Sequence, residues 1–293
     1  MPVKSDRRQH SRGMLMVLNR IRAATGLLAT AALGLPLASY GDALFGNDMA
    51  GDIKLPRTWG IGVDYFSMSQ PYRLDNLTFS PPVLPITDPS ILPIDSDIRH
   101  TDLKVDVWIT PFLNVFGIYG QIDGDTTINL GVLGLPFPPD VNSLVVDYDG
   151  DVYGGGIVFA IGGDRWFASV TGTFTDTNLQ GDFESSIKAT TIQPRLGLRA
   201  GENIEFWVGG YFLEAEEIHN GMLSLDLGPL VAPPGGPIPR PVDLGFGVSL
   251  SQEQDFNFSF GSHMMLSEGW EATVEVGAGD RRTMLANITY RFE

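Results

Sequence analysis

The chain has 293 residues and a formal net charge of −16 at pH 7, which disfavours nucleic acid as a partner because nucleic acids are bound through basic surfaces. It contains no cysteine, which excludes disulfides, thiolate metal sites and cysteine catalysis. Beyond residue 41 no uninterrupted apolar run reaches the ~18 residues that a membrane-spanning helix needs, and the 35 glycines and 20 prolines favour strands and turns.

The chain begins with a basic stretch followed by a short apolar one. Residues 23–38 are apolar and rich in small side chains, and small residues at positions 39–43 offer two cleavage motifs. The basic side chains ahead of them are Lys4, Arg7, Arg8, Arg12, Arg20 and Arg22. This pattern predicts a cleaved secretory signal peptide over residues 1–41. The alternative is an uncleaved anchor helix.

From residue 57 onward the sequence falls into alternating segments, which predict strands because successive side chains of a strand point to opposite faces. Ten strands are predicted, at 58–67, 99–110, 114–123, 149–161, 165–175, 186–199, 203–215, 254–266, 270–278 and 283–293. Short turns alternate with longer connections, namely long loops at 68–98, 124–147 and 216–250 and a medium loop at 176–185. Eight or twelve strands are the alternatives.

Within these strands one face is apolar and the other carries the charges. Phe206 and Val208 represent the apolar face, on which we also place Phe116 and Ile118, with Gln121 on the polar face. Such alternation predicts an all-β fold, a transmembrane antiparallel up-and-down β-barrel with its apolar face toward lipid. A soluble sandwich is the alternative. The five tryptophans fall near the same strand ends and predict an aromatic girdle at one interface.

The terminal strand has the clearest pattern. Residues 283–293, T-M-L-A-N-I-T-Y-R-F-E, alternate strictly, with Tyr290 two places before Phe292 and Glu293 after it. This ending resembles the last strand of Gram-negative outer-membrane β-barrel proteins, with no subfamily identified. The resemblance implies a place in the bacterial outer membrane, contact with its lipid and lipopolysaccharide, and recognition of this strand by the barrel-assembly machinery. Residues 42–56 would then form a short periplasmic segment before a barrel of residues 57–293, with the long loops outside.

Charged side chains of both signs share the predicted lumen face. They are Asp64, Asp102, Lys104, Asp106, Arg195, Arg199, Glu205, Glu271, Glu275 and Arg291. A barrel near ten strands has little interior space, so opposite charges should pair. Two interpretations stay open: a structural core of ion pairs, and a narrow polar conduit.

The three long loops are unusually apolar and hold most of the prolines. Their apolar side chains include Val83, Leu84, Ile86, Leu133, Leu135, Leu230 and Val231. Exposed apolar patches mark interaction surfaces, so we expect these residues to capture an apolar ligand or a partner. The alternative is a lid that packs on itself or sinks into lipopolysaccharide.

Evidence for catalysis or metal binding is thin. The pairs Asp147-x-Asp149 and Glu217-x-His219 resemble the paired acids and Asp–His pair of omptin proteases, although Glu replaces Asp. Asp147, Asp149 and Asp151 form a weak Ca²⁺ candidate that lacks the closing Glu of an EF-hand. No cofactor motif is present, and we expect no enzyme.

The sequence therefore predicts an outer-membrane barrel that acts as a narrow passive channel or a ligand-binding uptake barrel for small molecules, apolar ones included. A non-transporting structural or adhesive surface barrel is the alternative, and an omptin-like rim protease is a more remote one.

Overall fold

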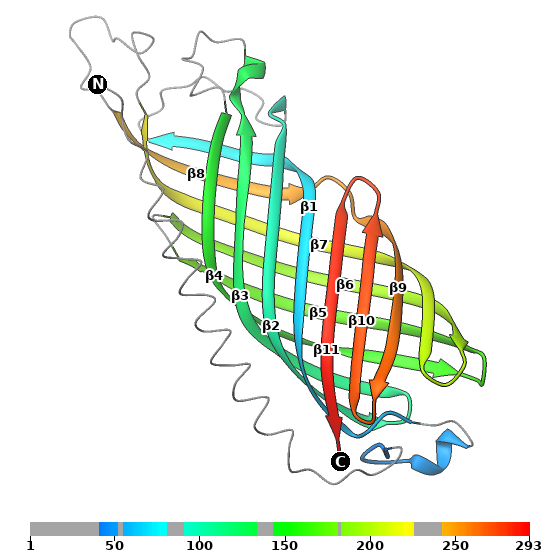
Figure 1. The fold of residues 1–293 in the computed structure, drawn as a ribbon. Helices are drawn as coiled ribbons and strands as arrows, with labels where there is room; N and C mark the ends of the chain where they lie inside the picture. Colours follow the sequence, from blue (N-terminus) through cyan, green and yellow to red (C-terminus); the bar gives the residue numbers. More distant parts are fainter. Residues whose placement is uncertain (1–40, 52–54, 81–90, 134–142, 181–182, 226–241) are drawn as a thin grey trace, which may run out of the picture. The chain divides into compact units, whose positions relative to one another are not determined.

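The computed structural model describes residues 41–51, 55–80, 91–133, 143–180, 183–225 and 242–293 (Figure 1). The predicted signal peptide lies outside these ranges, apart from Gly41. In the described part of the chain no helix is long and apolar enough to cross a membrane. Two short 3₁₀ helices are present, η1 (Asn47–Ala50) and η3 (Leu130–Leu133).

All other regular structure is antiparallel β-sheet. The strands are β1 (Trp59–Ser80), β2 (Ile94–Thr110), β3 (Leu113–Asn129), β4 (Ser143–Gly162), β5 (Trp166–Gln180), β6 (Phe183–Ala200), β7 (Ile204–Leu225), β8 (Val242–Gln252), β9 (Phe256–Ser267), β10 (Trp270–Ala278) and β11 (Arg282–Phe292). They are rich in β-branched and aromatic residues, which suit a pleated surface. Gly201 and Gly269 supply the positive φ of two tight turns, at 77° and 90°.

The lower part of the molecule is a closed ring of ten strands, which we call the lower section. β1 to β7 pair in chain order, β7 pairs with β9, and β9, β10 and β11 follow. β11 then pairs with β1 from Trp59↔Phe292 to Ser69↔Arg282, which closes the ring. The predicted ten-strand barrel is confirmed here. Closure leaves no sheet edge unpaired, as a membrane-spanning sheet requires.

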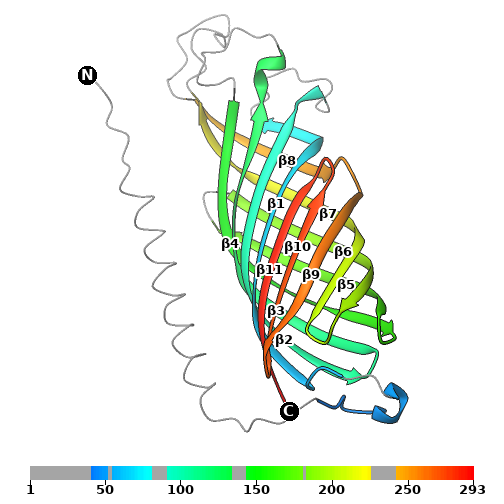
Figure 2. The ribbon, with the colours of Figure 1, turned by 45° about the vertical axis from the view of Figure 1, so that its right-hand side comes forward.

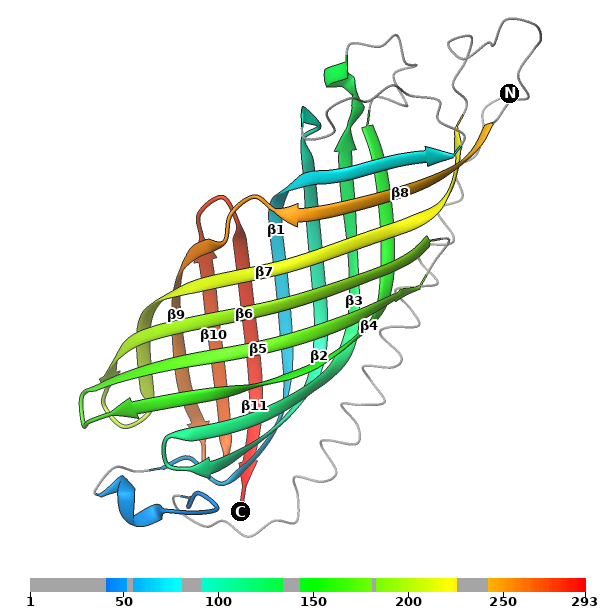
Figure 3. The same ribbon diagram turned by 180° about the vertical axis from the view of Figure 1, so that it is seen from behind.

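Above the short β10–β11 hairpin the ring loses two strands (Figures 1 and 2). β1 leaves β11 and pairs through Tyr72–Ser80 with β8, and β8 pairs on its other edge with the end of β7. Figure 3 shows β8 between β1 and β7. This upper section is therefore a ring of eight strands, β1 to β8, and a ring of that size is just filled by side chains.

The long loops are shorter than the sequence predicted. β1 continues to Ser80, β2 begins at Ile94 and β3 ends at Asn129, so much of 68–98 and 124–147 is strand. β4 begins at Ser143, β5 and β6 cover most of 176–185, and β7 and β8 cover both ends of 216–250. The strand ends were missed for one reason. In the upper section the polarity of the two faces is exchanged, with polar side chains outside and apolar ones inside.

The outer face of the lower section is a continuous band of exposed apolar side chains. Members from successive strands include Val63, Val105, Tyr119, Ile157, Val170, Leu196, Val208, Phe258, Val274 and Ile288. The charged side chains point inward. A closed ring that is apolar outside and polar inside is a transmembrane β-barrel of the bacterial outer-membrane type. The resemblance seen in the terminal strand is confirmed.

The predicted facing of β3 was wrong. Phe116 and Ile118 line the lumen, whereas Gln121 is exposed on the outside next to Tyr119. The cause is a bulge at the end of β2, between Trp108 and Thr110, which adds one residue to that side of the hairpin. One extra residue exchanges the two faces of the following strand.

The tryptophans do not all form a girdle. Trp59 and Trp166 are exposed on the outer face at the lower end, where Trp270 contacts Tyr290. Trp207, in contrast, is buried inside the barrel. Trp108 lines a lower cavity of about 360 Å³ beside η1. An interfacial belt thus accounts for three of the five.

Candidate functional site

Ion pairs cross the lower lumen. Arg291 of β11 donates from Nε to Glu271 of β10 at 2.5 Å and from Nη1 to Asp106 of β2 at 2.9 Å. Asn114 of β3 donates to the same Asp106 oxygen at 2.7 Å. These carboxylates are buried, so their partners replace part of the hydration that they lose, and among the described residues Oδ2 of Asp106 has no hydrogen-bond partner. The group joins the terminal strand to β2 across the closing seam of the ring.

Arg195 of β6 lies at the centre of a second group. Its Nε donates to Glu275 of β10 at 2.7 Å, and its terminal nitrogens donate to Thr171 at 3.1 Å and Gln193 at 2.8 Å. Trp207 donates from Nε1 to the same Glu275 oxygen at 2.8 Å, and its ring centroid lies 5.4 Å from the Arg195 guanidinium carbon. Every nitrogen group of Arg195 is therefore engaged.

A third group lies near the bottom of the ring. Arg199 pairs with Glu205 at 2.9 Å. His263 lies 3.7 Å from Glu205 and 3.6 Å from Glu271, and it connects this group to the first. The sequence pattern gave no partner for His263, because cross-strand neighbours depend on register.

The remaining predicted charges come from β1 and β2. Asp64 accepts a hydrogen bond from Asn287, and Asp102 lies 2.5 Å from Nδ1 of His100. Lys104 lines the lumen beside them. The structure thus places all ten predicted charged residues inside the barrel, in several groups rather than one. The pairing interpretation describes most of them.

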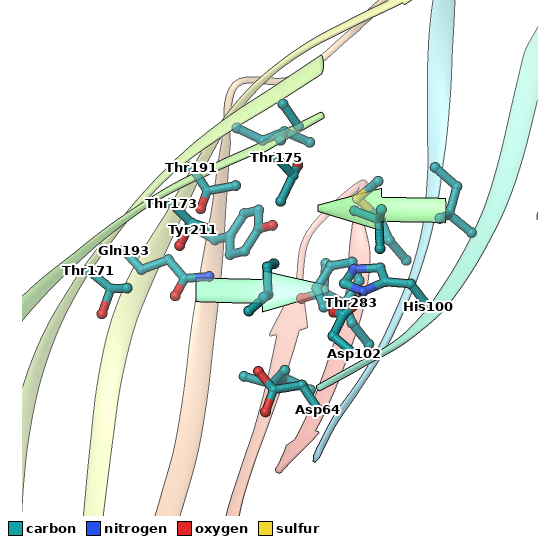
Figure 4. Close-up of a pocket in the computed structure, with 18 of the residues that line it drawn as sticks. Asp64, His100, Asp102, Thr171, Thr173, Thr175, Thr191, Gln193, Tyr211 and Thr283 are labelled. Atoms are coloured by element: carbon teal, nitrogen blue, oxygen red, sulfur yellow. Dashed lines mark hydrogen bonds and ion pairs between the residues drawn. The ribbon is translucent and has the colours of Figure 1, made fainter. Parts of the chain in front are cut away.

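Above these groups the lumen holds a cavity of about 280 Å³. One wall is a row of threonines, Thr171, Thr173, Thr175 and Thr177 of β5 with Thr191 of β6 (Figure 4). Asp64, His100 and Asp102 face it from β1 and β2. Apolar side chains complete the lining, among them Phe66, Met68, Ile98, Phe116, Ile118, Ile122 and Leu285. The cavity is amphipathic, with hydroxyls on one side and mainly apolar surface between.

Glycines of β4 let an aromatic ring of the cavity lining lie close to the barrel wall. Gly154 and Gly156 of β4 lie directly opposite Thr175 and Thr173 of β5, on the inward face. A Cβ added at Gly156 would come within 2.6 Å of the Phe116 ring, which occupies that space. The missing side chain at Gly156 therefore makes room for the Phe116 ring, which lines the cavity.

Packed apolar side chains close the lumen above the cavity. A first cluster contains Met68, Ile98, Ile122, Tyr148, Ile187, Tyr211, Leu213 and Ala215. A second, within the upper section, contains Tyr72, Leu74, Leu92, Ile94, Ile128, Val248 and Leu250. We call the second cluster the roof. Leu74 and Leu250 are each 1% exposed, so in this conformation the roof separates the cavity from the upper end.

A buried polar group lies between the two clusters. Glu217, which is 0% exposed, accepts a hydrogen bond from Tyr72 and lies 3.4 Å from Nε2 of His219. Tyr148 lies 3.3 Å from Ser96. Burial and the nearby Glu217 carboxylate raise the pKa of Tyr72 and of Tyr148 above the usual value of a tyrosine, so both side chains stay neutral.

The omptin-like arrangement is contradicted. Glu217 and His219 point into the barrel, whereas Asp147 and Asp149 are exposed on the outer face of β4. The wall separates the two pairs, so they cannot act on one bond. Asp151 follows on the same outer face, and among the described residues no three acidic, His or Cys side chains gather to hold a metal ion. The Ca²⁺ candidate is thereby not supported.

The apolar loop residues fall almost entirely outside the described ranges. Val83, Leu84, Ile86, Leu135, Leu230 and Val231 belong to segments that the structure does not describe. Leu133 is the last residue of η3. Their proposed role as a ligand or partner surface is neither supported nor opposed by the geometry.

Sequence reasoning missed the cavity. The T-x-T-x-T-x-T pattern at 171–177 was visible, and it marks an inward polar row. Its proximity to the glycines of β4 and to the aromatic side chains of β1 and β3 depends on strand order and register, which the pattern alone does not give.

Comparison with known proteins gives no family. No protein-family model matches the chain, and no curated protein matches it. Among solved structures, an outer membrane channel from Pseudomonas putida F1 aligns over 83% of this chain and 98% of that chain, at 12% identity and a TM-score of 0.37. The transport unit of the autotransporter AIDA-I from Escherichia coli aligns over 86% and 95%, at 10% identity and a TM-score of 0.38.

The toluene transporter TodX from Pseudomonas putida also aligns, over 86% of this chain and 93% of that chain, at 8% identity and a TM-score of 0.31. Likeness at this level carries no argument about activity. The assignment as a membrane-spanning barrel rests on the strand pairing and the outer apolar band of this chain.

Proposed function

We propose that this barrel binds small molecules, apolar ones included, in its lumen cavity and passes them across the outer membrane without an energy source. The observation that carries the proposal is the cavity of about 280 Å³ between paired charges below and apolar clusters above. An engineered apolar cavity of about 150 Å³ holds benzene, so this one has room for a molecule of one or two rings.

Passage through the upper section requires the roof to move, because its side chains fill the eight-strand ring. We therefore expect little conductance from the resting barrel. Shortening Leu74, Ile94 and Leu250 together to Ala should open the path. Ile218 lies exposed on the outer face of β7, so Ile218→Ala is the matched control.

The test is single-channel conductance of the refolded barrel in a planar bilayer, together with solute entry into vesicles. The triple variant should show discrete openings and faster solute entry than the parent and the control. A triple variant that folds but stays silent in both assays would refute the conduit.

Filling the cavity tests ligand binding separately. Ala189 of β6 points into the lumen against the first apolar cluster, whereas Thr190 points outward. Ala189→Phe should abolish binding of a small aromatic probe, and Thr190→Phe should leave it unchanged. Equal binding by both variants would show that the cavity is not the site.

A structural or adhesive barrel is the second candidate, and the packed roof favours it. That class predicts silence in every conductance and binding assay, including those of the triple variant. Loss of surface attachment in the Ala189→Phe variant is not expected, because the substitution lies inside the barrel.

We also propose that the apolar loop residues collect solute at the mouth. Alanine at Val83, Leu84, Ile86, Leu133, Leu135, Leu230 and Val231 should slow uptake without preventing assembly. Faster conductance instead would identify the loops as a lid, and lost surface binding alone would identify them as adhesive.

A further inference from the structure

We propose that the lumen cavity selects neutral molecules that combine an apolar ring or chain with a hydroxyl group. The inference rests on the proposed binding function and names its ligand class. Two features of the cavity carry it. One is how its charged side chains are partnered, and the other is how its threonine hydroxyls are.

Of the two cations on the cavity wall, Arg195 has all its nitrogens engaged. Arg195 places its nitrogens on Glu275, Thr171 and Gln193. Lys104 lies with Nζ 5.0 Å from the centroid of the Phe116 ring, on a wall that also carries acids. Lys104 has no ion pair or hydrogen bond within the described ranges, but Asp64 and Asp102 on the same wall would repel an anionic ligand, which would also lose its hydration.

The acids are engaged as well. Glu275 accepts from Arg195 and Trp207, and Asp102 is held by His100. The second oxygen of Asp102 has no hydrogen bond in the described part of the chain, but it packs against Gly120, where an added Cβ would lie 2.3 Å from it. It is directed at the wall rather than the cavity. Asp64 accepts from Asn287 and interacts electrostatically with Lys104 on the same wall, so a cationic ligand would meet that positive charge as well.

The hydroxyls, in contrast, are available. Thr173 and Thr191 are direct cross-strand partners, and Thr175 is the next inward residue of β5. Within the described ranges none of these three hydroxyls has a hydrogen-bond partner, and all three line the cavity (Figure 4). Each can both donate and accept. They form a patch that matches one ligand hydroxyl, while Phe66, Met68 and Ile118 contact its apolar body.

Four probes with one ring system separate the possibilities: naphthalene, 1-naphthol, 1-naphthoate and 1-naphthylmethylammonium. Binding is measured by equilibrium dialysis against the barrel in lipid nanodiscs, with empty nanodiscs as the blank. We expect 1-naphthol to bind about tenfold more tightly than naphthalene, because one buried hydrogen bond contributes about that much to affinity. Both ions should bind more weakly than 1-naphthol.

Valine at 173, 175 and 191 keeps the shape of threonine and removes the hydroxyls. In this triple variant 1-naphthol should fall to the affinity of naphthalene, while naphthalene itself is unaffected. Serine at the same positions should restore the difference. Thr190→Val, on the outer face of β6, is the control and should change nothing.

Two failures can be told apart. If naphthalene or an ion binds as tightly as 1-naphthol, or if valine has no effect, the ligand class is wrong and the binding function stands. If none of the four probes binds above the blank, the proposed binding function itself fails.

Discussion

The lower and upper sections share β1 to β7, yet their two faces have opposite polarity. On β2 the outward residues Leu103 and Val105 are apolar and the inward Asp102 is charged, whereas higher up the outward Asp97 is charged and the inward Ile98 is apolar. The direction in which each side chain points continues without a break. What changes is the medium outside, which is lipid around the lower section and water around the upper one.

The interiors of the two sections also differ in what they contain. The ten-strand ring has space for paired charges and for a cavity. The eight-strand ring is filled mainly by apolar side chains, as a soluble barrel is, with the buried Glu217 and His219 among them. The site therefore lies where the wide section ends, below the closed one.

The largest effect should come from an uncompensated charge in the lower section. Glu275→Leu leaves the Arg195 guanidinium buried without its acid. Losing one partner of a buried pair costs about 3–5 kcal/mol. The free energy of unfolding, from urea titration in lipid vesicles, should fall by that amount.

Combining Arg195→Met with Glu275→Leu should recover most of this loss, because no buried charge remains. A double variant as unstable as the single one would mean that the pair contributes through packing rather than charge.

A comparable loss is expected from the roof. Leu250→Ala removes a side chain that is 1% exposed in the upper section and should cost about 2–5 kcal/mol through lost burial and the space left behind. Leu285→Ala should cost less, because Leu285 borders a cavity already. Equal losses in the same urea titration would show that the upper section is no better packed than the lower.

The boundary between lipid and water can be located on one strand. Val208 and Glu216 both point outward from β7, the first in the middle of the apolar band and the second above it. Val208→Arg should cost about 2–4 kcal/mol at mid-membrane depth, and Glu216→Arg close to nothing. Heat-modifiable migration reports the folded fraction. Similar impairment by both variants would place Glu216 against lipid too.

The smallest effect is a pH dependence on the outer wall of the upper section. Asp125 lies between its cross-strand partners Asp97 and Asp147. Partial burial and these two carboxylates raise its pKa above the ordinary 3.8, partly offset by Arg99. The folded state then holds the proton more tightly than the unfolded chain, so stability falls as pH rises from 3.8 through the raised pKa.

Asp125→Asn should remove that fall and leave the barrel more stable than the parent at neutral pH. Asp176→Asn is the control, since Asp176 has Lys188 rather than an acid opposite it. The comparison uses the difference between each variant and the parent across an acid-to-neutral titration. A parent that gains stability relative to Asp125→Asn as pH rises would contradict the assignment.

The sequence by itself determined the strands that cross the membrane and, for most of them but not for β3, the side that meets lipid. Side chains of a strand alternate between its two faces, so a strand with one face in lipid has an apolar residue at every second position, as in residues 283–293. Such a strand and its lipid face can therefore be identified from the sequence. It also placed all ten lumen charges inside, because a charge facing lipid is costly.

Only the tertiary structure decided the rest. The bulge beside Trp108 exchanged the two faces of β3, and no residue pattern predicts a single added residue. β8 and β9 continue one another, yet they pair with different neighbours, and this narrows the ring from ten strands to eight. Partner choice and register bring Thr173 opposite Thr191 and place the Phe116 ring against Gly156. The cavity therefore exists only once the ring has closed.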